Sequence, residues 1–188
     1  MYTIRRYMEF TDEQLVLRFL EGDDGSLDIL IGRYLKPIYN FLYRFTKDTD
    51  SLDDLTQETF IKVWKNIKRF DPDKKFKVWI YQIAKNTAYD FLKKKKTTPF
   101  SFFETEEGNK LETVSEENPL PDEILERQDL EKELDAKLKQ LSDQHRVILF
   151  MRYKDDFSLQ EISEILKVPY NTVKSQHQRA IGALRRLF

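Results

Sequence analysis

The sequence predicts an all-α protein with two helical domains joined by a flexible acidic linker. Apolar residues recur at helical spacing in two long stretches, and no stretch of any length alternates with the period of a β-strand. Between those stretches, residues 97–121 combine many acidic side chains with three prolines and a glycine, a composition typical of linkers. We therefore expect one domain at residues 1–96, the linker at 97–121 and a second domain at 122–188.

The first domain is predicted to consist of helices with short connections. Ser26 and Ser51 are candidate N-caps of its second and third helices, because a serine side chain can accept a hydrogen bond from a first-turn amide. Pro37 falls inside the apolar stripe of the second helix, where a proline kinks or restarts a helix. A last helix is expected over residues 75–95.

The second domain begins after the linker. Its first apolar stripe consists of Ile124, Leu125, Leu130, Leu134, Leu138 and Leu141. Ser142 or Asp143 can cap the helix that follows. A short helix at residues 159–166, a turn at 167–169 and a helix running almost to the C-terminus then give helix-turn-helix organisation. The second helix of such a motif can enter the major groove of DNA.

Charge is strongly segregated along the chain, although the 188 residues carry a net charge of only -1. Residues 62–96 hold 12 basic and 3 acidic side chains, and residues 144–188 hold 8 and 4. Residues 97–143, between them, hold 5 basic and 14 acidic side chains. Two basic modules therefore flank an acidic spacer, and the pI of 6.2 does not argue against a nucleic-acid partner.

Several kinds of site are absent from the sequence. The chain has no cysteine, and its five glycines assemble no phosphate-binding loop. His145 and His177 have no partner histidine at helical spacing, so we predict no metal site and no cofactor. We find no signal peptide and no run of membrane-spanning length, so we expect a cytoplasmic protein with no membrane insertion of its own.

The final helix separates apolar from polar side chains when it is phased at 100° per residue. One side carries Val173, Ala180, Leu184 and Leu187, with His177 among them as a half-buried packing residue. The opposite half carries Asn171, Lys174, Ser175, Gln178, Arg179 and Arg185. Such side chains can read base edges or hold phosphates, although a merely solvated surface is the alternative.

The helix expected at residues 75–95 has a comparable division. One arc carries Phe76, Trp79, Ile80, Ile83, Thr87 and Phe91. The other carries Lys77, Tyr81, Gln82, Lys85, Tyr89 and Lys93, with Asn86 at its border. Cations interleaved with aromatic side chains suit phosphate attraction combined with base stacking. The alternative is a solvated amphipathic helix with a basic tail.

The helix expected at residues 52–68 offers a partly polar flank formed by Asp54, Gln57, Glu58 and Lys62. Its acidic residues favour the helix dipole, because they lie near the N-terminus. The functional alternative is a docking face for a basic partner surface.

Three motifs in this order resemble the group-four, or extracytoplasmic function (ECF), sigma factors of the sigma-70 family. Residues 54–64 resemble the helix that binds core RNA polymerase. Residues 69–71, followed by 76–86, are similar to the segment that melts and reads the minus-ten promoter element. The pattern from Glu161 to Ala180 is similar to the domain that reads the minus-thirty-five element.

The resemblance implies a promoter-specificity subunit that catalyses no covalent chemistry itself. It implies binding to core RNA polymerase (the beta and beta-prime subunits) through Asp54, Gln57, Glu58 and Lys62. Minus-ten DNA, including the melted non-template strand, would be bound by Asp73, Lys74, Lys75, Lys77, Tyr81, Lys85, Asn86 and Lys93. Minus-thirty-five duplex DNA would be bound by Asn171, Thr172, Lys174, Ser175, Gln178, Arg179 and Arg185. The family also implies a bacterial cytoplasmic location and control by an anti-sigma factor.

Three positions depart from the family pattern. Lys167 stands where the turn usually has glycine, Gln176 replaces a basic residue, and His177 replaces an aliphatic one. Three other kinds of protein remain as alternatives. They are an autonomous dimeric DNA-binding regulator, an enzyme acting on nucleic acid, and a sigma-like decoy that binds polymerase without opening promoters.

Overall fold

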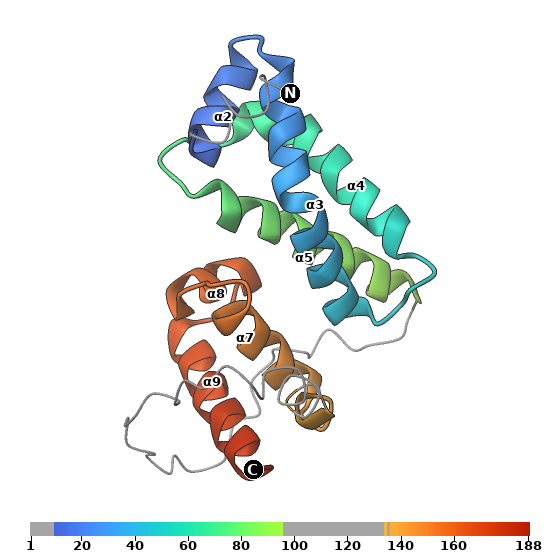
Figure 1. Ribbon diagram of the computed structural model, residues 1–188, viewed down its shortest axis with the longest axis vertical. Helices are drawn as coiled ribbons and strands as arrows, with labels where there is room; N and C mark the ends of the chain where they lie inside the picture. The colour runs from blue at the N-terminus through green and yellow to red at the C-terminus, as the bar shows by residue number, and fades with distance from the viewer. Residues whose placement is uncertain (1–9, 96–133, 135) are drawn as a thin grey trace, which may run out of the picture. The chain divides into compact units, whose positions relative to one another are not determined.

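The computed structural model describes residues 10–95, 134 and 136–188, and these residues form two compact units (Figure 1). Within these ranges every regular element is a helix, as the sequence predicts. The first unit is built around α2 to α5 and the second around α7 to α9. The predicted linker at 97–121 and the apolar positions 124, 125 and 130 lie outside the described residues.

Among the described residues, the first unit has four α-helices and one short 3-10 helix. They are α2 (Asp12–Leu20), α3 (Asp24–Thr46), α4 (Leu52–Asn66), η1 (Ile67–Arg69) and α5 (Phe76–Lys95). Helix α3 packs against α2, α4 and α5, and α4 also packs against α5. Figure 1 shows α5 crossing α3, with the loop that precedes α5 passing close to α2. Helix α5 is therefore held on more than one side.

Helix α3 differs in two details from the sequence-based expectation. It runs uninterrupted for 23 residues with Pro37 in its interior, so the proline does not restart the helix. It also begins before Ser26, which therefore does not cap it. The Ser26 hydroxyl is buried and donates to the Asp23 carboxylate at 3.0 Å. A hydroxyl one turn inside a helix can bond back toward the N-cap residue, and a sequence pattern does not distinguish this position from the cap itself.

Aromatic pairs form much of the core of the first unit. The ring of Phe41 lies 4.8 Å from that of Tyr81, centroid to centroid, and the ring of Phe45 lies 6.0 Å from that of Tyr89. Both pairs join α3 to α5 with edge-on geometry, which adds to the stabilisation from burial alone. The aromatic residues on one side of α5 are thus packing residues.

The described part of the second unit contains α7 (Asp143–Tyr153), α8 (Leu159–Leu166) and α9 (Tyr170–Arg185). Ser142 caps α7, as predicted, by accepting from the backbone N–H of His145 at 3.4 Å. Helix α8 begins with a reciprocal capping box. The backbone N–H of Ser158 donates to the Glu161 carboxylate at 2.8 Å, and the backbone N–H of Glu161 donates to the Ser158 hydroxyl at 3.2 Å.

The turn between α8 and α9 depends on a left-handed residue. Lys167 has φ +58°, and the N–H of Val168 closes the turn on the carbonyl of Ser163 at 3.2 Å. Pro169 then precedes α9 with φ -56°, a value that suits a helix start. The predicted helix-turn-helix is confirmed. No helix among the described residues is both long and apolar enough to cross a membrane.

Candidate functional site

Helix α9 exposes most of the polar side chains that the sequence predicts to face DNA. Val173 and Ala180 are fully buried, and Ile181, Ala183 and Leu184 pack partly buried against the same core. The exposed members of the predicted set are Asn171, Lys174, Gln178, Arg179 and Arg185. Thr172 and Ser175 are half-buried, and the Ser175 hydroxyl donates to the Thr172 carbonyl at 3.0 Å. The exposed face therefore presents cations and amides, while the packing face carries small and apolar groups.

His177 is half-buried on the packing side of α9, as expected. Its Nε2 lies 3.1 Å from the hydroxyl of Tyr153 on α7, and the two rings are 5.7 Å apart. Burial, followed by the positive charge of Arg152, lowers the pKa of His177. The histidine therefore joins α9 to α7 as a neutral side chain.

The residues predicted to face DNA on α5 and in the loop before it differ in their exposure. The exposed members are Asp73, Lys74, Lys75, Asn86 and Lys93, and Lys77 is half-buried. Tyr81 and Lys85, in contrast, are 1% and 4% exposed. The Lys85 ammonium lies 4.9 Å from the centre of the Tyr89 ring, and burial raises the pKa of Tyr89 to about 12.

The burial of Tyr81 against Phe41 of α3 corrects the expectation that it lies on the polar arc of α5. Helical phasing assumes one packed face and one open face. Helix α5 packs against both α3 and α4, so its apolar arc is wider than the single-face pattern implies. The remaining exposed positions are the loop before α5, Asn86 and the basic C-terminal end.

The loop at residues 71–75 is short and internally bonded. The carboxylate of Asp71 accepts from the backbone N–H of Asp73 at 3.1 Å, and its carbonyl accepts from that of Lys74 at 3.0 Å. Behind the loop lie Phe70, Phe76 and Trp79, whose rings are 5.3 to 5.6 Å apart in pairs. The exposed polar loop is thus flanked by a packed cluster of aromatic side chains.

Helix α4 presents Asp54, Gln57 and Glu58 to solvent, while Lys62 is engaged within the unit. The Lys62 ammonium contacts the Glu58 carboxylate at 2.9 Å, the Thr87 hydroxyl at 3.1 Å and the Asp90 carboxylate at 3.5 Å. Thr87 and Asp90 belong to α5. Lys62 therefore ties α4 to α5, in addition to any contact with a partner.

Two large apolar side chains on α4 are exposed, although the sequence counts Trp64 among the apolar residues of this helix. Ile61 is 44% exposed and Trp64 is 59% exposed. They follow Gln57 at spacings of four and seven residues, and this spacing places all three on one outer face. Helical spacing was the signal that could have found them. Exposed aromatic and aliphatic groups beside carboxylates are typical of protein interfaces.

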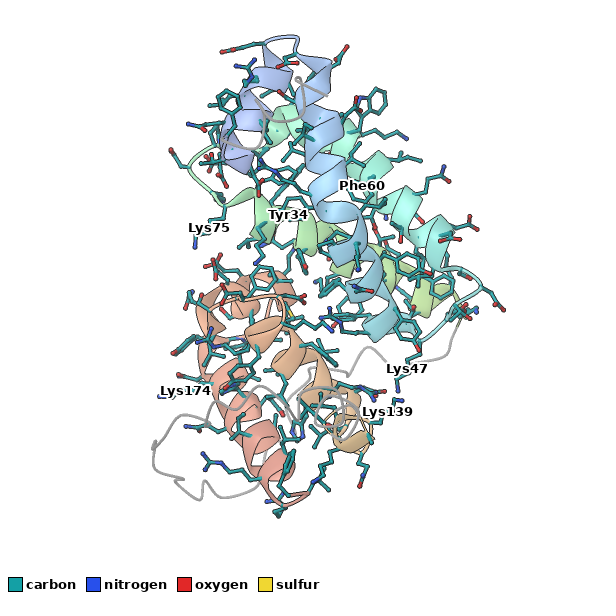
Figure 2. The ribbon with its side chains drawn as sticks, viewed as in Figure 1. Tyr34, Lys47, Phe60, Lys75, Lys139 and Lys174 are labelled. Atoms are coloured by element: carbon teal, nitrogen blue, oxygen red, sulfur yellow. The ribbon has the colours of Figure 1, made fainter. Side chains whose placement is uncertain are left out.

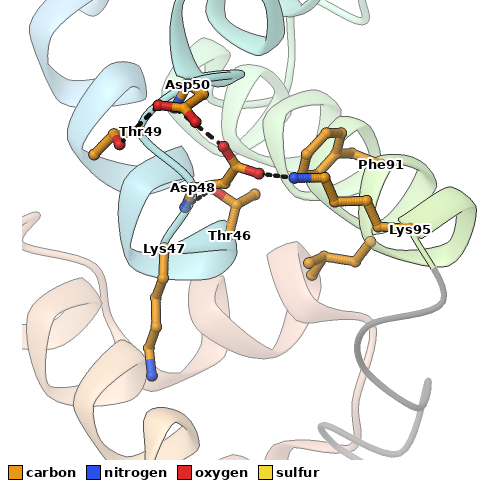
Figure 3. A pocket seen from close by; sticks show the side chains of 8 residues that line it. Thr46, Lys47, Asp48, Thr49, Asp50, Phe91 and Lys95 are labelled. Atoms are coloured by element: carbon orange, nitrogen blue, oxygen red, sulfur yellow. Dashed lines mark hydrogen bonds and ion pairs between the residues drawn. The ribbon is translucent and has the colours of Figure 1, made fainter.

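A surface pocket lies where the α3–α4 turn meets the end of α5 (Figure 3). There the Lys95 ammonium contacts the Asp48 carboxylate and lies 4.9 Å from the centre of the Phe91 ring. The hydrogen bond from Lys95 lowers the pKa of the Asp48 carboxyl. This ion pair fastens the C-terminal end of α5 to the turn. Within the described ranges no cluster of acidic and histidine side chains could hold a metal ion.

Comparison with known proteins identifies the family. Residues 30–98 match Sigma-70 region 2, and residues 138–186 match Sigma-70 region 4. Over 182 residues the chain is 31% identical to the ECF RNA polymerase sigma factor SigW of Bacillus subtilis, covering 95% of this chain and 97% of that protein. The two matched regions define a sigma-70 protein. The chain belongs to the ECF sigma factors of that family, which are transcription specificity factors and not a known class of enzyme.

Two solved structures share the fold. CnrH, in complex with the cytosolic domain of CnrY, has a TM-score of 0.63 at 19% identity and covers 94% of this chain and 96% of its own. RpoE of Bartonella quintana, in complex with the anti-sigma factor NepR, has a TM-score of 0.58 at 23% identity and covers 84% and 92%.

Proposed function

We propose that this chain directs core RNA polymerase to promoters by reading an upstream duplex element with α9 and a melted minus-ten element with the 71–75 loop and α5. The observation that carries the proposal is the separation of faces on α9. Lys174, Gln178 and Arg179 are exposed, while Val173 and Ala180 are buried against the rest of the second unit. A helix held in this way can enter a major groove without disturbing its own packing.

In binding the upstream element, amide and basic side chains would have different roles. Gln178 can bond to the edge of an adenine, and Asn171 at the start of α9 can do the same. Lys174, Arg179 and Arg185 supply positive charge for base edges and phosphates. Sequence choice would therefore depend on few side chains, and affinity on several.

For the minus-ten element, the 71–75 loop supplies the exposed polar groups, and the packed aromatic side chains of Phe70, Phe76 and Trp79 supply rigidity. Extracting a base from a duplex costs about a few kcal/mol, which new contacts must offset. Lys74, Lys75 and Lys77 lie near the entry of α5, and Asn86 and Lys93 lie farther along it. Tyr81 contributes to this site by holding α5 in place, since it is buried against Phe41.

For core polymerase, we propose the outer face of α4 as the contact surface. Asp54, Gln57 and Glu58 supply polar groups, and Ile61 and Trp64 supply apolar area beside them. Large aromatic side chains at the centre of an interface commonly carry much of its binding energy. The partners would be the beta and beta-prime subunits, in the bacterial cytoplasm.

We also propose that an anti-sigma factor controls this chain. RpoE of Bartonella quintana was solved bound to the anti-sigma factor NepR, and CnrH was solved bound to the cytosolic domain of CnrY. A protein that covers the exposed faces of α4 and α9 would block both proposed interfaces.

The test is transcription by purified core polymerase, with and without this chain, on a pooled library of promoter-length DNA, followed by sequencing of the RNA starts. We expect protein-dependent starts that share two spaced motifs. The double variant Lys174→Ala, Arg179→Ala should lose the upstream motif preference. Lys139→Ala is the matched control, since Lys139 is an exposed lysine of the same unit that is not part of α9.

The alternatives give different results in the same assay. A decoy would bind core polymerase and produce no protein-dependent starts. An autonomous regulator would protect DNA from cleavage in the absence of polymerase. Either result would contradict the proposed function.

A further inference from the structure

The residue before helix α5 cannot cap it with its own side chain. Its first backbone bond runs from the N–H of Trp79 to the carbonyl of Lys75 at 3.2 Å, which makes Lys75 the residue that precedes the helix. A capping side chain must accept a hydrogen bond, and lysine has only donors. The first turn of α5 also contains no acidic residue. Any side-chain cap for the first amides must therefore come from a residue other than Lys75.

Glu13 on α2 provides that acceptor. Its carboxylate oxygen Oε1 accepts from the backbone N–H of Phe76 at 2.9 Å, across 63 residues of sequence. Phe76 is fully buried, so its N–H without Glu13 would be an unsatisfied donor in the interior. A carboxylate at this end of a helix is also favoured by the helix dipole.

Glu13 is itself held firmly, because the start of α2 is fixed twice. Thr11 and Gln14 form a reciprocal capping box, with bonds of 2.9 and 3.2 Å. Asp12 accepts from the Arg33 guanidinium at 2.7 Å and from the hydroxyl of Tyr34, both on α3. The position of Glu13 is thus tied to the longest helix of the unit.

The same junction reaches the core. The ring of Tyr34 lies edge-on to that of Phe76, with centroids 5.5 Å apart. Burial, followed by the hydrogen bond to Asp12, raises the pKa of Tyr34, so this hydroxyl stays protonated and continues to donate. Figure 2 shows Tyr34 inside the unit and Lys75 at its edge, on the loop that leads into α5. Helices α2, α3 and α5 meet where that loop ends.

The loop at residues 71–75 therefore has two fixed ends. At one end, Phe70 is buried and its N–H donates to the carbonyl of Ile67 at 3.0 Å. At the other end, the bond from Phe76 to Glu13 sets where the loop stops and α5 starts. A loop of five residues held at both ends has few conformations, and ordering it again on binding costs little.

We infer that Glu13 is a positioning residue for capture of the unpaired minus-ten base, acting from α2 through the backbone of Phe76. This inference rests on the proposed function, since it assigns Glu13 to the site formed by the 71–75 loop. The proposed role of Glu13 involves no contact with DNA. Its contribution is to hold the loop in the conformation that accepts the base.

The test uses holoenzyme assembled from core polymerase and the full chain. The probe is a fluorescein-labelled single strand carrying the non-template minus-ten sequence of the strongest promoter recovered from the library. A duplex carrying the upstream element of the same promoter is the second probe. We expect Glu13→Ala to weaken single-strand binding about fivefold, which corresponds to loss of a helix cap worth about 1 kcal/mol. Binding to the duplex upstream element should stay unchanged.

Two further variants separate positioning from general damage to the fold. Glu13→Gln keeps an oxygen acceptor at the same reach, so it should restore most of the lost single-strand affinity. Glu13→Asp keeps the charge but is shorter, and should fall between alanine and the unaltered chain, which keeps the test valid if Glu13→Ala does not fold. Glu21→Ala is the matched control, because Glu21 is an exposed acid at the other end of α2.

Three outcomes would overturn the inference. Single-strand affinity of Glu13→Ala could equal that of the unaltered chain, Glu13→Gln could be as weak as Glu13→Ala, or duplex binding could fall in proportion to single-strand binding. A different outcome concerns the proposed function. If the unaltered holoenzyme binds the non-template strand no better than its complement, the minus-ten assignment fails and this inference fails with it, before any variant is compared.

Discussion

The two helices proposed to face DNA are held in the molecule in different ways. Helix α5 packs against both α3 and α4 and buries polar side chains such as Tyr81 and Thr87. Helix α9 buries only Val173 and Ala180 completely. Packing and recognition are therefore separate on α9, whereas on α5 the residues that hold the helix lie among those that would bind DNA. Substitutions of the exposed residues of α9 should change binding alone, and many substitutions on α5 should change binding and stability together.

The largest expected effect is on stability, from Tyr81→Ala in α5. The Tyr81 ring is fully buried against Phe41, and removing a buried aromatic side chain costs about 3–5 kcal/mol. The loss should be measured by urea unfolding of the full chain, followed by circular dichroism.

The control for this prediction is Asn86→Ala, an exposed position on the same helix. It should change the free energy of unfolding by less than about 0.5 kcal/mol while weakening single-strand DNA binding. If Tyr81→Ala left stability intact and reduced only DNA binding, Tyr81 would belong to the DNA-facing surface after all, and the contrast between α5 and α9 would be lost.

The next largest effect is on binding, from Lys174→Ala in α9. Lys174 is exposed, so we expect about tenfold weaker binding of holoenzyme to the upstream duplex. The slope of log affinity against log salt should fall by about 1 if Lys174 contacts a phosphate. Fluorescence anisotropy at several salt concentrations measures both quantities.

Lys139→Ala supplies the comparison for Lys174, because it removes one exposed positive charge from the same unit (Figure 2). Equal losses in the two variants would indicate a general charge effect and no specific role for α9. A change in the melting temperature with Lys174→Ala would show that α9 does not separate packing from recognition.

The same contrast explains what the sequence could predict. The phasing of α9 identified Asn171, Lys174, Gln178, Arg179 and Arg185 as exposed, because a helix with one packed face follows the amphipathic pattern, but it also placed the half-buried Ser175 there. The phasing of α5 misplaced Tyr81, because a second packed face is set by tertiary contacts that no local pattern records. The motifs sufficed for the fold class and the family. No sequence pattern predicted the hydrogen bond from the Phe76 N–H to Glu13, because it joins helices that are far apart in the sequence.

Some local features missed from the sequence were visible in it. The pair Ser158 and Glu161 has the spacing of a capping box at the start of α8, and the structure forms that box. Trp64 and Ile61 lie at helical spacing from Gln57, a pattern that predicts a shared face. The apolar type of these two residues favoured a core assignment, and only their exposure in the structure shows otherwise.

A smaller effect is expected from Lys167→Gly in the turn before α9. Lys167 adopts φ +58°, where a side chain costs about 1 kcal/mol that glycine avoids. The substitution should therefore stabilise the second unit by about that amount and leave α5 unchanged. Hydrogen exchange of α8 and α9 amides, compared with α5 amides, measures this locally. Faster exchange in α9 would mean that the left-handed turn is not strained.

The smallest effect is expected from mild acid, which should destabilise α9 more than α5. Burial lowers the pKa of both His145 and His177, so the folded second unit resists protonation. An unfolded histidine has a pKa of about 6.5. As the pH falls from about 7.5 to 5.5, the unfolded state therefore takes up protons first, and the folded second unit loses stability.

On α5, the raised pKa of Tyr89, about 12, leaves that group unchanged over this range. Amide exchange in α9, corrected for the intrinsic effect of pH, should accordingly accelerate at the lower pH more than exchange in α5. His177→Leu should remove part of the difference, because leucine fills the packing site without titrating, and the remainder should depend on His145. Equal acceleration in α5 and α9, or none in α9, would show that these histidines do not couple protonation to the stability of the DNA-reading helix.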